Sequence, residues 1–169
     1  MFKITHELQS TDTLSDGDIN LESLMNDHFF GNICFDNGNG QVIETNWKRL
    51  PLFAFSMLLL DACGNLYENA EDEEELYATD SEEDNKIVLR RKGENRIEIR
   101  APFTDIVIET GFKGFLQAAE RFNEKLALDI WHRHFYGNRN DAHVEFYIHN
   151  FVSPINAVTR QGITWESYV

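Results

Sequence analysis

The chain has 169 residues and a formal net charge of −14, with 15 lysines and arginines against 29 aspartates and glutamates. This charge argues against direct binding to nucleic acid, because that binding depends on cationic side chains that displace counterions from the phosphates. It argues equally against binding to an anionic membrane surface. The length and the 42% hydrophobic content suit one globular domain over residues 1–169, which is large enough to bury a core.

The sequence indicates a cytoplasmic protein. Its first seven residues contain no cationic segment followed by a long apolar run, as a secretory signal would. The most apolar stretch, 50–60, covers eleven residues, whereas a membrane-spanning helix needs about 20. Two cysteines, Cys34 and Cys63, are too few for a disulfide framework and lack the paired spacing of metal ligands. We therefore expect reduced, unreactive thiols, no bound metal and no cofactor.

In the first third of the chain the sequence predicts a short helix and a hairpin. Polar, turn-forming residues at 9–18 lead into the predicted helix at 19–25. Two β-prone runs, 29–35 and 41–45, follow. Asn-Gly pairs, which tolerate a positive φ, join these two runs and predict the hairpin between them.

A buried helix is predicted over residues 47–62, because this segment is apolar nearly all round. Pro51 would lie in its first turn, where a missing amide donor costs little. The helix is expected to stop at Cys63-Gly64-Asn65, since glycine and asparagine favour helix ends.

An acidic tract follows at about 68–84, where ten of 17 residues are acidic and none is lysine or arginine. Removing these ten charges from −14 leaves only −4 for the rest of the chain. Like charges at this density repel one another in a regular element, so the sequence predicts an exposed acidic loop. Within it, Leu76-Tyr77-Ala78 is the candidate for a short strand.

The sign of the charge inverts directly after this tract. Six lysines and arginines fall within residues 86–100, around a predicted turn at 92–95. Ile97 and Ile99 alternate with charged residues, as in an antiparallel strand with one buried face. With apolar residues at 87–89 and a third strand at 105–110, these segments predict a meander with one packed and one charged face.

The clearest predicted helix runs from Phe112 to about His134. Its apolar residues recur at spacings of three and four and form one stripe, while charged residues take the opposite side. Alternation at 144–148 predicts a last strand. Hairpins and a meander packed with two main helices, about 47–62 and 112–134, make an α+β fold with an antiparallel sheet the expected class.

Histidines near the end of the chain are the only candidates for a metal-dependent enzyme. His132, His134 and His143 lie near Asp141, and such residues can bind zinc or manganese. His132 and His134 are two apart on a predicted helix, however, so they would not share a face. No nucleophile elbow, phosphate-binding loop or dinucleotide fingerprint occurs. We expect no enzyme activity, and a metal-dependent hydrolase at these histidines is the alternative.

The acidic tract has three interpretations. It is a solvated loop that maintains solubility, or it pairs with the basic strands that follow it, or it binds a cationic partner protein. In the third case its carboxylates would steer the encounter and two tyrosines would anchor the partner. The candidate partner-binding residues are Tyr67, Glu68, Glu71, Asp72, Glu73, Glu74, Glu75, Tyr77, Asp80, Glu82, Glu83 and Asp84.

A small acidic α+β domain of this kind resembles the immunity proteins of bacterial contact-dependent growth inhibition and other polymorphic toxin systems. The stretches that add to the resemblance are Phe29-Phe30-Gly31-Asn32-Ile33-Cys34-Phe35-Asp36-Asn37-Gly38 and Asn46-Trp47-Lys48-Arg49-Leu50-Pro51. The resemblance implies a protein that binds the C-terminal toxin domain of a cognate effector and blocks its active site or its access to substrate. Such toxins are often basic nucleases, many of them acting on transfer RNA. A dimeric regulatory adaptor, with a homodimer interface, is the remaining alternative.

Overall fold

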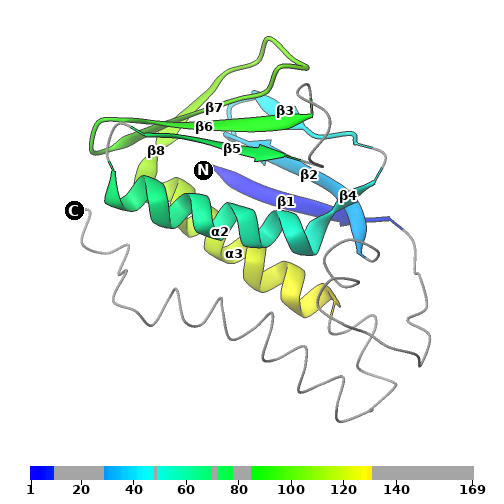
Figure 1. Cartoon of the computed structure of the whole chain (residues 1–169). Helices are drawn as coiled ribbons and strands as arrows, with labels where there is room; N and C mark the ends of the chain where they lie inside the picture. Colours follow the sequence, from blue (N-terminus) through cyan, green and yellow to red (C-terminus); the bar gives the residue numbers. More distant parts are fainter. Residues whose placement is uncertain (10–28, 48, 70–71, 78–84, 131–169) are drawn as a thin grey trace.

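The computed structural model describes residues 1–9, 29–47, 49–69, 72–77 and 85–130. Within these ranges the chain forms two four-stranded antiparallel sheets and two helices that lie side by side against them (Figure 1). One cluster of buried apolar side chains includes residues of both sheets and both helices. The α+β class with antiparallel sheets, predicted from the sequence, is confirmed.

The first sheet is built around a central strand, β2. Its strands are β1 (Lys3–Leu8), β2 (Phe30–Asp36), β3 (Val42–Glu44) and β4 (Leu50–Pro51). β2 pairs with β1 along one edge and with both β3 and β4 along the other. The predicted hairpin is confirmed as β2–β3, and its turn places Gly38 and Gly40 at φ of 75° and 88°. Glycine adopts these angles without steric cost, which explains the Asn-Gly pairs.

The second sheet is a meander of consecutive strands. In order across the sheet these are β5 (Glu73–Tyr77), β6 (Lys86–Lys92), β7 (Arg96–Arg100) and β8 (Ile108–Gly111). Buried Ile97 and Ile99 on β7 lie opposite Arg91 and Leu89 on β6, so these four side chains point to the same face. That face meets the core, and the opposite face remains open, as the sequence predicts.

The helices are α2 (Leu52–Glu68) and α3 (Phe112–Ile130). α2 packs against β5 and α3 packs against β1, and the two helices touch each other. The apolar stripe predicted for α3 is buried at six positions: Phe112, Phe115, Leu116, Ala119, Phe122 and Leu126. No helix among the described residues is both long and apolar enough to cross a membrane.

Several predicted boundaries differ from the structure. α2 starts at Leu52, so Pro51 lies just before the first turn, and it continues past Gly64 because Leu66 extends its buried stripe. The strand expected at 105–110 begins only at Ile108. The predicted helix at 19–25, the predicted strand at 144–148 and the last residues of the 112–134 helix lie outside the described residues.

The expectation of an acidic loop at about 68–84 is wrong for the part of it that the structure describes. Glu68 ends α2, and Glu73–Tyr77 form β5, which pairs antiparallel with the basic strand β6. Repulsion among the carboxylates is overcome because Leu76 is buried in the core and because β6 offers both backbone partners and positive charge. The interpretation in which the tract folds back on its basic neighbour therefore holds for residues 73–77.

A buried arginine on β6 joins the ends of several elements. Arg91 is 4% exposed and donates hydrogen bonds to the carbonyl oxygens of Leu66 and Tyr67 in the last turn of α2. It also donates to the carbonyl oxygens of Gly93 and Glu94 in the β6–β7 turn. Its guanidinium lies 4.4 Å from the ring centroid of Phe112, the first residue of α3. A cation at a helix C-terminus is favourable, and a buried charge is tolerated only when its donors are used.

Replacing Arg91 with methionine should destabilise the fold strongly. Removal of the guanidinium leaves the carbonyl oxygens at the end of α2 without their donor. We therefore expect the free energy of unfolding to fall by about 3 kcal/mol. The neighbouring exposed Arg90 provides the matched control, since Arg90→Met should change this energy by less than about 0.5 kcal/mol. Urea denaturation of the three proteins measures both values, and equal effects at the two positions would contradict the role assigned to Arg91.

Candidate functional site

The open face of the second sheet carries charged side chains of both signs. The period-two alternation that buries Ile87 and Leu89 turns their neighbours on β6 outward. The charged residues on this face are Glu73, Glu75, Lys86, Arg90, Lys92, Arg96, Glu98, Arg100 and Glu109. Four carboxylates thus face five cationic groups, so this face as a whole is nearly neutral.

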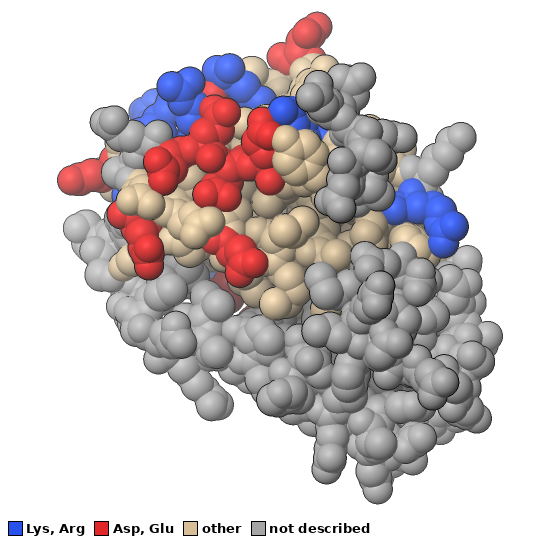
Figure 2. Space-filling view, viewed as in Figure 1, with Lys and Arg blue, Asp and Glu red and all other residues tan. Residues whose placement is uncertain are grey.

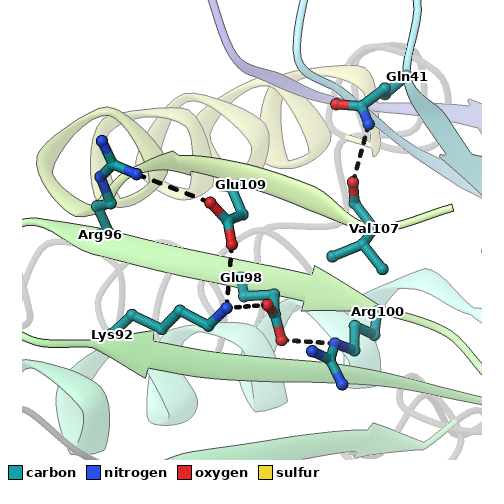
Figure 3. Close-up of polar contacts among 7 residues, drawn as sticks. All are labelled: Gln41, Lys92, Arg96, Glu98, Arg100, Val107 and Glu109. Carbon is teal, nitrogen blue, oxygen red and sulfur yellow. Dashed lines mark hydrogen bonds and ion pairs between the residues drawn. The ribbon is translucent and has the colours of Figure 1, made fainter.

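Glu98 lies at the centre of this face and is surrounded by cations. Its carboxylate is 3% exposed and accepts a hydrogen bond from Lys92, while Arg100 Nε lies 2.5 Å from its Oε1 (Figure 3). Lys92 Nζ also donates to Glu109 at 3.0 Å, and Arg96 lies 3.8 Å from the same carboxylate. Most charged side chains at the centre of the open face therefore form ion pairs with one another.

Two opposed effects act on the carboxyl group of Glu98. Burial raises its pKa, and the hydrogen bonds and charges of Lys92 and Arg100 lower it. The cations prevail, and the pKa of Glu98 lies below its ordinary value. The carboxylate is therefore ionised at neutral pH and holds the two cations in place.

Carboxylates dominate at the edge formed by β5 and the end of α2. We define this acidic surface as the described acids of the tract: Glu68, Asp72, Glu73, Glu74 and Glu75. All except the half-buried Glu74 are exposed. Figure 2 shows acidic residues gathered over β5 and α2, with the basic residues of the neighbouring strands beyond them. Five of the predicted partner-binding carboxylates thus lie at the end of α2 and along residues 72–75, with Glu73 and Glu75 on the open face of β5 and Glu74 on the side of Leu76.

Only part of this acidic surface is neutralised. Lys86 Nζ lies 2.6 Å from Glu75, which also accepts a hydrogen bond from Tyr77. These hydrogen bonds, that from Lys86 foremost, lower the pKa of Glu75. Among the residues that the structure describes, none forms an ion pair with Glu68, Asp72, Glu73 or Glu74.

The two tyrosines expected to anchor a partner are half-buried. Tyr67 lies in the last turn of α2, where its carbonyl oxygen accepts from Arg91, and Tyr77 ends β5 under the ammonium group of Lys86. Five further predicted partner-binding residues lie outside the described residues: Glu71, Asp80, Glu82, Glu83 and Asp84.

Neither thiol is activated for chemistry. Cys63 is 1% exposed in the core, and burial raises its pKa far above the ordinary value. Burial also raises the pKa of Cys34, which is half-buried on β2. Both groups therefore stay protonated at neutral pH, and a protonated thiol is a poor nucleophile.

Metal ligands are not assembled in the part of the chain that the structure describes, where no group of three His, Cys, Asp or Glu side chains could hold an ion. The histidines of the hydrolase alternative, His132, His134 and His143, lie outside that part, as does Asp141.

Two features of this region differ from what the sequence predicts. Arg91 belongs to the cluster of basic residues at 86–100, but its position two after Leu89 places it on the buried face of β6. The burial of Glu98 could not be read from the sequence, because it arises from long cationic side chains contributed by β6 and β7.

Comparison of the chain with protein-family models, with curated proteins and with solved structures gives no match in any of the three.

The ion pairs of Glu98 should make the stability of the protein depend on pH. Because its pKa is lowered in the folded state, its stabilising contribution is complete above the unfolded value of about 4.5 and is lost as the pH falls through the folded value. Glu98→Gln should lower the free energy of unfolding by about 1 to 2 kcal/mol at pH 7, with a difference from the wild type that shrinks below pH 4.5.

Urea denaturation at a series of pH values measures this difference. Glu7→Gln, which removes an exposed carboxylate from β1, is the control and should shift stability by less than about 0.5 kcal/mol throughout. A Glu98→Gln effect that stayed constant from pH 7 down to pH 3 would contradict the assignment.

Proposed function

We propose that this chain is an immunity protein, a binding protein that neutralises a cationic toxin domain. The toxin would be a basic nuclease that acts on RNA such as transfer RNA, and the chain would occlude its active site or its access to substrate. The observation that supports this proposal is the acidic surface at the β5 edge. Its carboxylates at Glu68, Asp72 and Glu73 are exposed and form no ion pair with any described residue.

Ion pairing is uneven over the second sheet. At the centre of its open face, Glu98 and Glu109 form ion pairs with Lys92, Arg96 and Arg100. Among the five carboxylates of the acidic surface, only that of Glu75 forms an ion pair with a described residue, Lys86. A surface of one sign attracts a partner of the opposite sign over several ångströms and speeds diffusional association. The substrate groove of a nuclease is cationic because it must bind phosphates, so it has the complementary charge.

The direct experiment uses the reading frame immediately upstream of this gene, where a cognate toxin would be encoded. The C-terminal domain of that product should form a one-to-one complex with the chain, measured by calorimetry. Cells that express the domain should stop growing, and co-expression of the chain should restore their growth. Failure of the chain to bind the domain or to protect the cells would refute the proposal.

Charge removal from the acidic surface should slow capture of that domain. The variant Glu68→Gln/Asp72→Asn/Glu73→Gln loses three negative charges, and we expect its association rate constant to fall about tenfold at low salt. The rate should also depend less on ionic strength, because fewer charges contribute to steering. Stopped-flow or surface plasmon resonance measurements at several salt concentrations give both quantities.

The matched control removes the same charge from other surfaces of the protein. Glu7, Glu44 and Glu124 are exposed acids on β1, β3 and α3, and their triple change to glutamine leaves the same net charge as the test variant. Equal slowing in both triple variants would show that only net charge matters and that the acidic surface is not the interface.

A further inference from the structure

A pocket lies on the open face of the second sheet, directly beside the acidic surface. Its volume is about 470 Å³, and it opens to solvent. Val88 on β6 contributes from the sheet, and the segment 101–107 between β7 and β8 forms a wall. The lining residues are Glu73, Val88, Arg100, Ala101, Pro102, Thr104, Asp105, Ile106 and Val107. Glu73 also belongs to the acidic surface, so the two features are continuous.

The wall of the pocket is held in place by contacts at both ends. The amide of Thr104 donates to the carbonyl oxygen of Ala101 at 3.2 Å, which closes a turn. Gln41 Nε2, in the turn before β3, donates to the carbonyl oxygen of Val107 at 3.1 Å (Figure 3). The ring of Phe103 meets the ring of Trp47 edge-on, with 5.8 Å between the centroids. The first sheet therefore supports this segment, and the pocket needs little reorganisation to accept a ligand.

The chemistry of the lining combines apolar surface with carboxylates. Val88, Pro102 and Ile106 provide apolar contact, and Ile106 is 38% exposed. Glu73 and Asp105 add two exposed carboxylates that form no ion pair with any described residue. Arg100 is the cation in this lining, and its Nε lies 2.5 Å from the buried carboxylate of Glu98, which also pairs with Lys92. The lining thus has two carboxylates against one cation, so a cationic group with an aliphatic stem complements both its charge and its apolar surface.

We infer that this pocket receives a lysine or arginine side chain of the basic partner. The aliphatic stem would pack on Val88 and Ile106, and the charged group would interact with Glu73 and Asp105. Long cationic side chains are well suited to such a site, because they bury their methylene groups and keep the charge at the rim. This inference rests on the proposed function: the acidic surface attracts the partner, and the pocket provides the anchor that holds it.

A test that needs no partner uses small probes and nuclear magnetic resonance. N-acetyl-arginine amide and N-acetyl-lysine amide should shift the methyl signals of Val88 and Ile106 at millimolar concentrations. N-acetyl-norleucine amide, which keeps an aliphatic stem and lacks the charge, should bind at least threefold more weakly. Asp105→Asn should weaken binding of the arginine probe by a similar factor. Val88→Phe, which fills the pocket, should abolish the shifts.

The control for the filled pocket is Val42→Phe. Val42 is an exposed valine on β3 that does not line the pocket, so the same change of side chain there should leave probe binding unaltered. Equal binding of the norleucine and arginine probes would overturn the inference, as would the absence of any shift. Shifts that grow with protein concentration alone would identify a second copy of the chain as the occupant, which also overturns it.

The upstream-encoded toxin domain then separates this inference from the proposed function. Val88→Phe should increase the dissociation rate constant of that complex at least tenfold and change the association rate constant little, because it removes a contact made after encounter. Normal binding by Val88→Phe would refute the anchor and leave the proposed function intact. Failure of the wild-type chain to bind would refute the proposed function, and the small-probe result would still decide whether the pocket binds cations.

Discussion

The buried guanidinium of Arg91 is the contact on which the arrangement of the described elements depends. Its side chain donates to four backbone carbonyl oxygens, two at the end of α2 and two in the β6–β7 turn. It also packs on the ring of Phe112, the first residue of α3. Its backbone amide also donates to the carbonyl oxygen of Asp72, just before β5. Leaving a buried charge without partners costs several kcal/mol, so these segments are held together. The end of α2 and the start of β5 carry the acidic surface, whose position is thereby fixed.

The distribution of charge over the surface follows from which strands pair in the sheet. Cations of β6 and β7 pair with carboxylates of β7 and β5: Lys92 and Arg100 hold Glu98, and Lys86 holds Glu75. Glu68, Asp72, Glu73 and Glu74, at the end of α2 and on or next to β5, form no ion pair with any described residue. The net charge of −14 is therefore no uniform property of the molecule. Carboxylates are in local excess at one edge, next to a pocket lined by apolar and charged side chains.

Much of the fold could be predicted because its signals are local. The apolar stripe of α3, the alternation of Ile97 and Ile99, and the Asn-Gly turn each depend on neighbours a few residues apart. β5 could not be predicted in the same way, because its stability comes from pairing with β6 and from burying Leu76. Charge density alone favoured a loop there. Of the candidate site, the carboxylates of the acidic tract can be seen in the sequence, and their role in binding stays a prediction. The pocket cannot be seen there, because it depends on segments far apart in the sequence, Glu73, Val88 and residues 101–107.

Hydrogen–deuterium exchange of the chain, alone and in complex with the upstream-encoded toxin domain, tests the central claim most directly. The claim is that the β5 edge and the adjoining pocket form the interface. Amides in 66–77 and 100–107 should exchange more slowly in the complex, while those of α3 should be unchanged. Protection confined to β1 and α3, with 66–77 and 100–107 exchanging as in the free protein, would contradict the account.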